Sequence, residues 1–467
     1  MICFGRISPG GDARAQAVTA RTSAVHQLPG LDGTLLLDDV ARGAAAQDWG
    51  HHVHRSPAVV VRPGSANDVV RAIAYANERK LKIAMRGQGH SVYGQAQVDG
   101  GVVIDSTGLN AVSWRGAQTL DAQPGALWSA VAMTALARGL VPPVMTDALM
   151  LSVGGTLSVG GTGETSYRSG AQVDHVQELD VVTGSGQLVT CAPDRNKELF
   201  HMVLGGLGQC GIIVRARLRV ERAPVYVATR ILIYDDLVAL LSDQTRLAAS
   251  NALYLLGAEL TRQSDGRWEL MLRTGTPSTS ETEQTSTPSW MVELRFKAEG
   301  PSDRMSYWGY LDRRTPSIAA GRKAGVPNPS LAVMLPERTV QPFLAYVMST
   351  PAAAAGIWRI EVIPMITRRF RQPLLVVPSE PLAFTVRLQR RALAGNGPDH
   401  DAMLAANRAL VQRCMAVGGK IYPPFAPILS PEQWRQHYGA ATWRRFSSAK
   451  RRFDPNNILT PGAGVFA

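Results

Sequence analysis

Cysteine is scarce in this sequence, and its placement argues against two kinds of site. The 467 residues include four cysteines, which are Cys3, Cys191, Cys210 and Cys414. Their separations fit neither metal-ligand spacing nor the disulfide framework of a small secreted domain. The sequence therefore predicts reduced thiols and no metal site.

Long apolar runs are absent as well. The N-terminal stretch MICFGRISPGGDARAQAVTA lacks the apolar core of about 7 to 15 residues that a signal peptide needs. No later window is long and apolar enough to cross a membrane. With 45% apolar and 18% charged residues, the composition is that of an ordinary globular protein. We predict a soluble, cytoplasmic protein without a membrane partner.

A nucleic-acid-binding motif is also missing, although the net charge is +12. Basic residues are scattered, and the densest group, at 443–453, is typical of a helix with a solvated basic face. We therefore expect no nucleic-acid partner. A small anionic ligand, such as a cofactor pyrophosphate, needs only a few of these charges.

The chain is too long for one comfortable core, so two domains are expected. Strands are predicted at 58–63, 81–85, 101–106 and 211–221, a hairpin at 176–192, and helices at 65–80 and 126–139. Longer strands follow at 226–234, 253–261, 267–275 and 357–366, with helices at 401–419 and 432–453 and a polar loop at 276–289. This alternation predicts an α+β protein.

Glycine is concentrated in three segments, at 86–95, 152–163 and 204–211. Such segments expose backbone amides to phosphate or to a flat ring, whereas the alternative is tight turns between strands. The glycines of GQGHSVYG depart from the dinucleotide fingerprint G-x-G-x-x-G, and no Lys-Ser/Thr pair closes a P-loop. Three segments in one domain favour a phosphate-bearing cofactor held by another fold.

Five segments together resemble the cytokinin dehydrogenases. They are RGQGHSVYGQAQ (86–97), VMTDALMLSVGGTLS (144–158), QELDVVTGSGQLVTCAP (177–193), LFHMVLGGLGQCGIIVRARL (199–218) and KRRFDPNNILTPGAGVF (450–466). Those enzymes are FAD-linked oxidoreductases of the vanillyl-alcohol oxidase / p-cresol methylhydroxylase (PCMH-type) superfamily. The likeness implies a PCMH-type FAD-binding domain of two subdomains and an α+β substrate domain with an antiparallel sheet. We assign 1–224 to the FAD-binding domain, with its core at 55–224, 225–405 to the substrate domain, and 406–467 to a segment that returns to the first.

His90 occupies the position of the family's histidine that is joined to the 8α-methyl group of the flavin. A neutral imidazole nitrogen can attack the electrophilic methide tautomer of an oxidised flavin. From composition alone, a histidine that only hydrogen-bonds within its loop is the first choice, and the resemblance reverses this order. No cysteine lies in 144–152, so a single covalent link is implied, with Cys210 a small apolar filler. The other residues implied to contact FAD are Arg86, Gly87, Gln88, Gly89, Ser91, Gln95, Thr146, Asp147, Ser152, Gly154, Gly155, Ser158, Thr162, Ile213, Tyr422 and Thr460.

Asp147 matches the family's catalytic aspartate. Oxidation of a C–H beside N–H or O–H needs a hydride acceptor and a base that bonds the departing proton, and an ionised carboxylate serves as that base. The alternative role is a cap of the following turn.

The substrate side departs from the family. Asn328 and Ser330 replace a tryptophan and an asparagine, Pro423 replaces a leucine, and Leu256 replaces a glutamate unless Glu259 is that residue.

These departures favour a substrate other than an adenine-type cytokinin. The leading hypothesis is an FAD-dependent oxidase or dehydrogenase. It removes a hydride from a carbon beside nitrogen or oxygen of a medium-sized organic molecule, such as a secondary-metabolite intermediate, and passes the electrons to O2 or another acceptor. A narrower form adds loss of CO2, with Arg313, Arg314 and Arg359 available as a carboxylate clamp. The alternatives are a cytokinin dehydrogenase with a rearranged cavity and a non-catalytic flavin-binding protein. A monomer or homodimer is expected.

Overall fold

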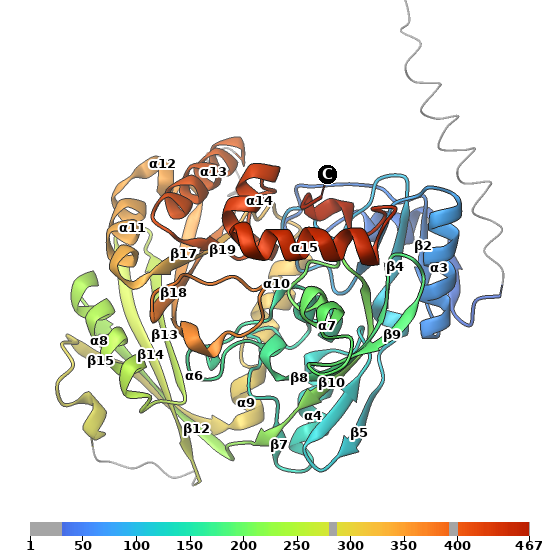
Figure 1. The fold of residues 1–467 in the computed structure, drawn as a ribbon. Coiled ribbons are helices and arrows are strands. Elements are labelled where there is room, and N and C mark those ends of the chain that lie inside the picture. Colours follow the sequence, from blue (N-terminus) through green and yellow to red (C-terminus); the bar gives the residue numbers. More distant parts are fainter. Residues whose placement is uncertain (1–29, 280–286, 392–399, 467) are drawn as a thin grey trace, which may run out of the picture.

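The computed structural model describes residues 30–279, 287–391 and 400–466. Cys3, the first part of the predicted FAD-binding domain and the centre of the polar loop at 276–289 lie outside these ranges. The three sheets that position the site divide the molecule into a glycine-rich half and a half built on one large sheet (Figure 1).

The chain begins with a small, mostly parallel sheet in the order β1-β2-β4-β3. Its strands are β1 (Thr34–Leu36), β2 (Val59–Arg62), β3 (Ile83–Arg86) and β4 (Val102–Asp105). Helix α3 (Ala66–Glu78) begins at Ser65, as the sequence predicts, because the Ser65 side chain accepts a hydrogen bond from the Asp68 amide. Val69 and Ile73 of α3 are fully buried in one cluster with Val59 and Val61 of β2 and Val102 of β4. This packing fixes the end of β3, from which the glycine-rich segment 86–95 leaves.

A second, antiparallel sheet follows in the order β5-β6-β10-β8-β9. Its strands are β5 (Val112–Gly116), β6 (Thr119–Ala122), β8 (Val176–Val182), β9 (Leu188–Cys191) and β10 (Ile212–Arg219). The helices of this region are α4 (Trp128–Leu136), α5 (Val153–Val159), α6 (Ser166–Ser169) and α7 (Lys197–Val203). Helix α5 carries the glycines at the start of the second segment, and the third segment ends directly before β10. Since α5 contacts β10, the two segments lie close together in space.

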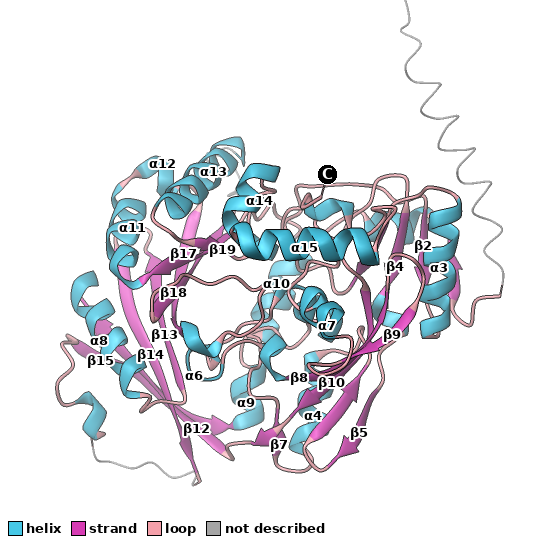
Figure 2. Cartoon of the chain, in the orientation of Figure 1, coloured by secondary structure: helices cyan, strands magenta, loops and turns pink. Residues whose placement is uncertain are grey.

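The other half is an antiparallel sheet in the order β15-β12-β14-β13-β17-β18-β16-β19. Its long strands are β12 (Tyr226–Tyr234), β13 (Leu255–Arg262), β14 (Trp268–Ser278), β15 (Ala298–Ser306), β16 (Leu331–Pro336), β17 (Ile357–Ile366) and β18 (Leu382–Arg390). The helices α8 (Leu237–Ser250), α11 (Glu337–Ser349), α12 (Pro351–Ala354) and α13 (His400–Ala416) lie on the side away from the glycine-rich half (Figure 2). The opposite, inner face of the sheet is therefore turned toward the glycine segments. The α+β class with an antiparallel sheet is confirmed.

Helices α9 (Tyr307–Asp312) and α10 (Thr315–Ala324) connect β15 to β16. After α13, the short strand β19 (Lys420–Ile421) joins the large sheet, and α14 (Pro431–Tyr438) and α15 (Ala440–Phe453) return to the glycine-rich half (Figure 1). The domain boundary assigned at residue 405 thus falls inside α13, while the boundary at 224 falls between β11 (Glu221–Arg222) and β12.

Two predicted element limits differ from the structure. The helix expected over 432–453 is two helices, because Gly439 has φ +75° and ψ 158°, a conformation that ends a helix and that only glycine adopts readily. The polar loop expected from residue 276 begins later, because β14 continues to Ser278, where it pairs with Tyr226 of β12.

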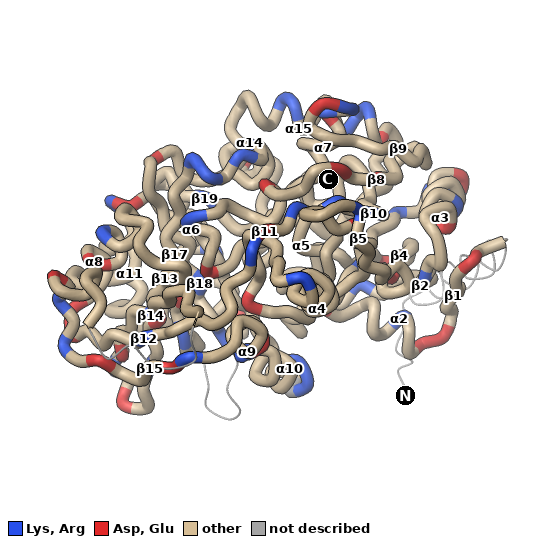
Figure 3. Tube along the Cα trace, turned by 90° about the horizontal axis from the view of Figure 1, so that it is seen from below, with Lys and Arg blue, Asp and Glu red and all other residues tan. Residues whose placement is uncertain are grey.

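Within the described residues, none of the helices is both long and apolar enough to cross a membrane. Basic and acidic residues are interspersed along the described chain (Figure 3).

Candidate functional site

A cavity of about 770 Å³ lies between the glycine segments and the inner face of the large sheet. Pockets for drug-sized ligands measure about 300–1,000 Å³, so this one has room for a sizeable organic group. The residues predicted for FAD that line it are Gly87, Gln88, Gly89, His90, Ser91, Gln95, Thr146, Asp147, Ser152, Gly154, Gly155, Ser158, Thr162, Ile213, Tyr422 and Thr460. Two of the residues predicted for substrate, Asn328 and Ser330, line it as well.

The loop at 86–95 is held from behind by the segment around Asp48. The carboxylate of Asp48 accepts hydrogen bonds from the amides of Gly94 (2.7 Å) and Gly50 (3.0 Å) and from the hydroxyl of Ser91 (3.3 Å). The amide of Trp49 donates to the carbonyl of Gly89 at 2.8 Å. Burial raises the pKa of Asp48 to about 6, against the lowering effect of these hydrogen bonds. The loop therefore has a fixed shape.

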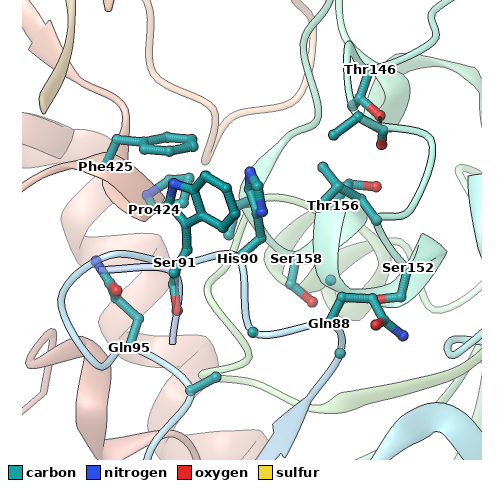
Figure 4. Close-up of a pocket in the computed structure, with 18 of the residues that line it drawn as sticks. Gln88, His90, Ser91, Gln95, Thr146, Ser152, Thr156, Ser158, Pro424 and Phe425 are labelled. Carbon is teal, nitrogen blue, oxygen red and sulfur yellow. Dashed lines mark hydrogen bonds between the residues drawn. The ribbon is translucent and has the colours of Figure 1, made fainter. Parts of the chain in front are cut away.

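His90 lies at the middle of the loop and of the cavity wall. Figure 4 shows its ring between Pro424 and Phe425 on one side and Thr156 and Ser158 on the other. Its ring centroid is 4.7 Å from that of Trp49 and 6.1 Å from that of Phe425. Burial, and after it the charges of Arg387 and Arg322, lower the pKa of His90 to about 3. The imidazole is therefore neutral at pH 7, the form in which a ring nitrogen is a nucleophile.

The glycines form a wall of bare backbone. A Cβ on Gly87 would lie 2.0 Å from Oγ of Ser152, and one on Gly154 would lie 2.6 Å from Cβ of Pro124. Glycine therefore lets the segments around Gly87 and Gly154 pack closely against Ser152 and Pro124. A wall of this kind lets backbone amides approach a phosphate or a flat ring closely, which fits the FAD implied by the sequence.

Three predicted site residues do not line the cavity. Nη2 of Arg86 donates to the carbonyl of Gln47 at 2.9 Å, so Arg86 braces the loop from behind. Leu256 is fully buried in β13, where side chains alternate between the two faces of the sheet. Glu259, three residues later, therefore faces the opposite, inner side. Pro423 accepts a hydrogen bond from Nε2 of Gln95 through its carbonyl, and its neighbours Tyr422, Pro424 and Phe425 line the cavity in its place.

Asp147 lies between two guanidinium groups. Its Oδ2 is 3.6 Å from Nη1 of Arg314 and 3.5 Å from Nη1 of Arg387. Arg314 comes from the start of α10 and Arg387 from the inner face of β18. Two cations from the large-sheet half thus fix a carboxylate that belongs to the glycine-rich half.

A larger ion-pair network continues from Asp147 across the inner face of the sheet. Glu361 of β17 pairs with Arg314 (2.5 Å), Arg359 (2.6 Å) and Arg387 (2.9 Å). Burial alone would raise the pKa of Glu361, but these three arginines lower it well below its usual value. Glu361 is therefore ionised and holds the arginines together.

Glu164 and Glu259 extend the network. Glu164 pairs with Arg313 (2.8 Å) and with Arg273 of β14. Glu259 lies 3.6 Å from Arg359 and 3.4 Å from Arg314. The sequence indicated Arg313, Arg314 and Arg359, and Glu259 as an alternative to Leu256. It did not indicate the other members of the network, which are Arg273, Arg387, Glu164 and Glu361. The available signal was the pattern of charged residues inside otherwise apolar strands, such as Arg359 and Glu361 within IWRIEVIPMI.

Comparisons with known proteins agree with this geometry. Residues 57–192 match the model of a family described as FAD binding domain, and residues 268–466 match one described as cytokinin dehydrogenase 1, FAD and cytokinin binding. Together the two matched ranges include the residues of both sides of the cavity, except for the segment around Asp48 and the residues between 192 and 268.

Curated relatives align along almost the whole chain. An uncharacterised oxidoreductase, ORF5 in the fasciation locus of Rhodococcoides fascians, is 36% identical over 92% of this chain and 99% of its own. Cytokinin dehydrogenase 4 of Oryza sativa subsp. japonica is 32% identical over 93% and 90%, and cytokinin dehydrogenase 10 of the same plant is 34% identical over 92% and 88%. The resemblance inferred from the motifs is confirmed. The chain therefore belongs to the family of FAD-dependent oxidoreductases that includes the cytokinin dehydrogenases.

Proposed function

We propose that this protein oxidises a medium-sized organic substrate by removing a hydride from a carbon next to nitrogen or oxygen. In this proposal His90 is the point of covalent attachment of FAD and Asp147 bonds the departing proton. The observation that carries it is that His90 and Asp147 line one cavity together with the glycine wall. When bound, FAD would supply the ring that accepts the hydride, and with it the two electrons of the oxidation.

The residues around Asp147 support its role. Arg314 and Arg387 hold the carboxylate from two directions, and this fixes its position relative to a bound substrate. A carboxylate in this place can accept a hydrogen bond from the N–H or O–H that loses its proton as the adjacent C–H bond breaks. The neutral imidazole of His90 and the rigid loop around it support the covalent link in the same way.

The substrate side favours a molecule other than a cytokinin. Asn328 and Ser330 are engaged within the protein, since their side chains hydrogen-bond to each other (2.5 Å) and Oγ of Ser330 also accepts from the backbone amide of Arg390 (3.2 Å). The free surface there comes instead from Trp358, Arg359 and Arg391. An N6-substituted adenine is uncharged and does not need these cations.

A cytokinin dehydrogenase is the second candidate. The matched family over residues 268–466 and the named plant relatives favour it. Turnover of isopentenyladenine would select this candidate, and failure to bind any N6-substituted adenine would remove it.

Oxidative decarboxylation is a narrower form of the first candidate. In that reaction a carboxylate substrate gives up a hydride to FAD and loses CO2, and the electron pair left behind forms a carbon–carbon double bond. One CO2 released for each flavin reduced would identify it.

The test of the main proposal is anaerobic reduction of the bound flavin. We expect a substrate of the proposed class to bleach the visible flavin band of the wild-type protein. Asp147→Asn should slow this step by about 10²-fold or more without loss of bound FAD. Readmission of air then distinguishes O2 from another acceptor by the rate at which the colour returns.

Asp265→Asn is the matched control, because Asp265 pairs with Arg267 in an exposed loop outside the cavity. Its reduction rate should equal that of the wild type. If no metabolite reduces the flavin, the non-catalytic alternative is correct. If Asp147→Asn reduces at the wild-type rate, Asp147 is not the base.

Covalent attachment has a separate test. Acid-denatured wild-type protein should carry flavin fluorescence on a gel, and His90→Ala should not. His54→Ala removes an exposed histidine outside the cavity and should retain the fluorescence. A fluorescent His90→Ala band, or a wild-type band without fluorescence, would contradict the assignment of His90.

A further inference from the structure

A bulge in β17 presents two successive side chains to the cavity. Ile357 pairs with Arg390 of β18 and Arg359 pairs with Gln389, so Trp358 is an extra residue between them. Bulges re-aim side chains and are frequent beside functional sites. Trp358 and Arg359 consequently both line the cavity, together with Gln389 and Arg391.

Two guanidinium groups lie against the indole of Trp358. The Cζ atom of Arg359 is 5.1 Å from the ring centroid and that of Arg391 is 5.0 Å from it. Both distances are within the range of cation–π attraction. This part of the wall thus combines a flat apolar surface with two positive charges.

The ion-pair network next to it is not neutral. Its cations are Arg273, Arg313, Arg314, Arg359 and Arg387, and its anions are Asp147, Glu164, Glu259 and Glu361. Five positive charges therefore meet four negative ones. Arg391 adds a further charge, since it forms no ion pair within residues 30–279, 287–391 and 400–466. The excess charge of the network is largely buried and is costly unless an anion compensates it, whereas the exposed Arg391 adds attraction for the same anion.

Hydrogen-bond donors are also left over at this place. The Nε atoms of Arg359 and Arg387 are buried and have no hydrogen-bond partner among the described residues. These Nε atoms are closed off from the open cavity, so a carboxylate there would be bound by the outer Nη donors of Arg359. A carboxylate would compensate the excess positive charge and accept hydrogen bonds from the guanidinium groups.

We propose that the substrate carries a carboxylate on a flat ring, with the carboxylate bound by Arg359 and Arg391 and the ring lying on Trp358. This inference rests on the proposed function, because it names the substrate class of the same cavity. It places the anion on the wall built by β17 and β18, beside the network that positions Asp147. A substrate with a carboxylate matches the positive charge of the cavity. An uncharged analogue of the same shape does not.

Benzoate and benzamide test the inference, because they have nearly the same shape and differ in charge. Binding to the full-length, FAD-loaded protein is followed through changes in the visible spectrum of the oxidised flavin. We expect benzoate to bind about tenfold or more tightly than benzamide, as a charge-assisted hydrogen bond predicts. Arg391→Gln should weaken benzoate binding by about the same factor and leave benzamide unchanged.

Arg359→Gln should give the same loss, but it also removes partners of Glu361 and Glu259 and can affect folding. Arg391 is exposed, so Arg391→Gln keeps the test valid. Arg138→Gln is the matched control. Cζ of Arg138 lies 4.1 Å from the ring centroid of Trp114, which makes another arginine–tryptophan pair outside the cavity. It should bind benzoate like the wild type.

Equal affinity for benzoate and benzamide would overturn the inference, and so would unchanged benzoate binding by Arg391→Gln. The positive charge would then serve a different purpose, such as compensating the reduced cofactor. Failure of the proposed function is a different result. In that case no compound reduces the flavin, while the preference for benzoate in the oxidised protein remains.

Discussion

At the scale of single residues, Asp48 decides how His90 is presented. This buried carboxylate lies behind the loop 86–95 and accepts hydrogen bonds from both Ser91 and Gly94, the residues on either side of the short turn after His90. A carboxylate inside a protein is costly when ionised, and the three hydrogen bonds offset only part of this cost. Asp48 therefore couples the shape of the flavin-side loop to pH.

The coupling has a definite sign. The pKa of Asp48 is raised from 3.8 to about 6 in the folded protein. The protonated form thus stabilises the fold fully below about pH 4, and this contribution is lost as pH rises through about 6. Asp48→Asn does not titrate. The wild-type advantage in the free energy of unfolding should therefore fall by about 2–3 kcal/mol between pH 4 and pH 7.

Urea unfolding of both FAD-loaded proteins across this range measures the difference directly. A difference that stays constant with pH would show that Asp48 titrates normally. Asp105→Asn, which removes an aspartate that pairs with Arg62, is the control. If its free energy of unfolding showed the same pH-dependent difference from the wild type, the effect would not be specific to Asp48.

At the scale of elements, the sequence predicts most strands and helices because their patterns are local. The strands with β-branched runs, β2, β10 and β12, and the helix α3 with its serine cap all lie where the sequence predicts them. The sequence does not predict the helix break at Gly439, because a single glycine is tolerated within many helices. Only its backbone angles distinguish a glycine that ends a helix from one that lies within it.

Site residues that belong to contiguous motifs could be predicted from the sequence. Site residues that become neighbours through strand pairing could not. The loop with His90 and the segment with Asp147 are short continuous motifs, so they could be aligned. The partners of Asp147 could not, because Arg387 becomes its neighbour only through the register of β18 beside β17. Leu256 was chosen over Glu259 for the same reason. The choice depends on which face of β13 each residue occupies, and the alternation is fixed only once the strand is paired.

At the scale of the whole molecule, one buried ion pair shapes the C-terminal segment where it returns to the glycine-rich half, and its lysine also donates to Oε1 of Gln209 there at 3.3 Å. Nζ of Lys450 is 2.6 Å from Oδ2 of Asp454, and the Asp454 carboxylate also accepts hydrogen bonds from the amides of Ile458 and Leu459. These contacts shape the turn that brings Thr460 to the cavity, where its amide donates to the carbonyl of Ile83 at 2.8 Å.

Removal of Lys450 should be costly, because it leaves the Asp454 carboxylate buried without its cation. We expect Lys450→Met to lower the free energy of unfolding by about 3–5 kcal/mol. Arg452→Met is the matched control on the same helix. Arg452 is 69% exposed and pairs with Glu198 at the surface, so its loss should cost about 1 kcal/mol or less. Equal losses in a urea titration of the two FAD-loaded variants would contradict this role of the buried pair.

The return of the C-terminal segment also sets an order of events during synthesis. Tyr422, Phe425 and Thr460 line the cavity together with the glycine segments, which are complete once residue 211 has been made. A nascent chain can build its first two sheets early, but it has no closed cofactor site until the last of these residues leaves the ribosome. We therefore expect cofactor loading to follow completion of the chain. A chain interrupted after the large sheet would be folded in most of its parts and still be unable to retain its flavin.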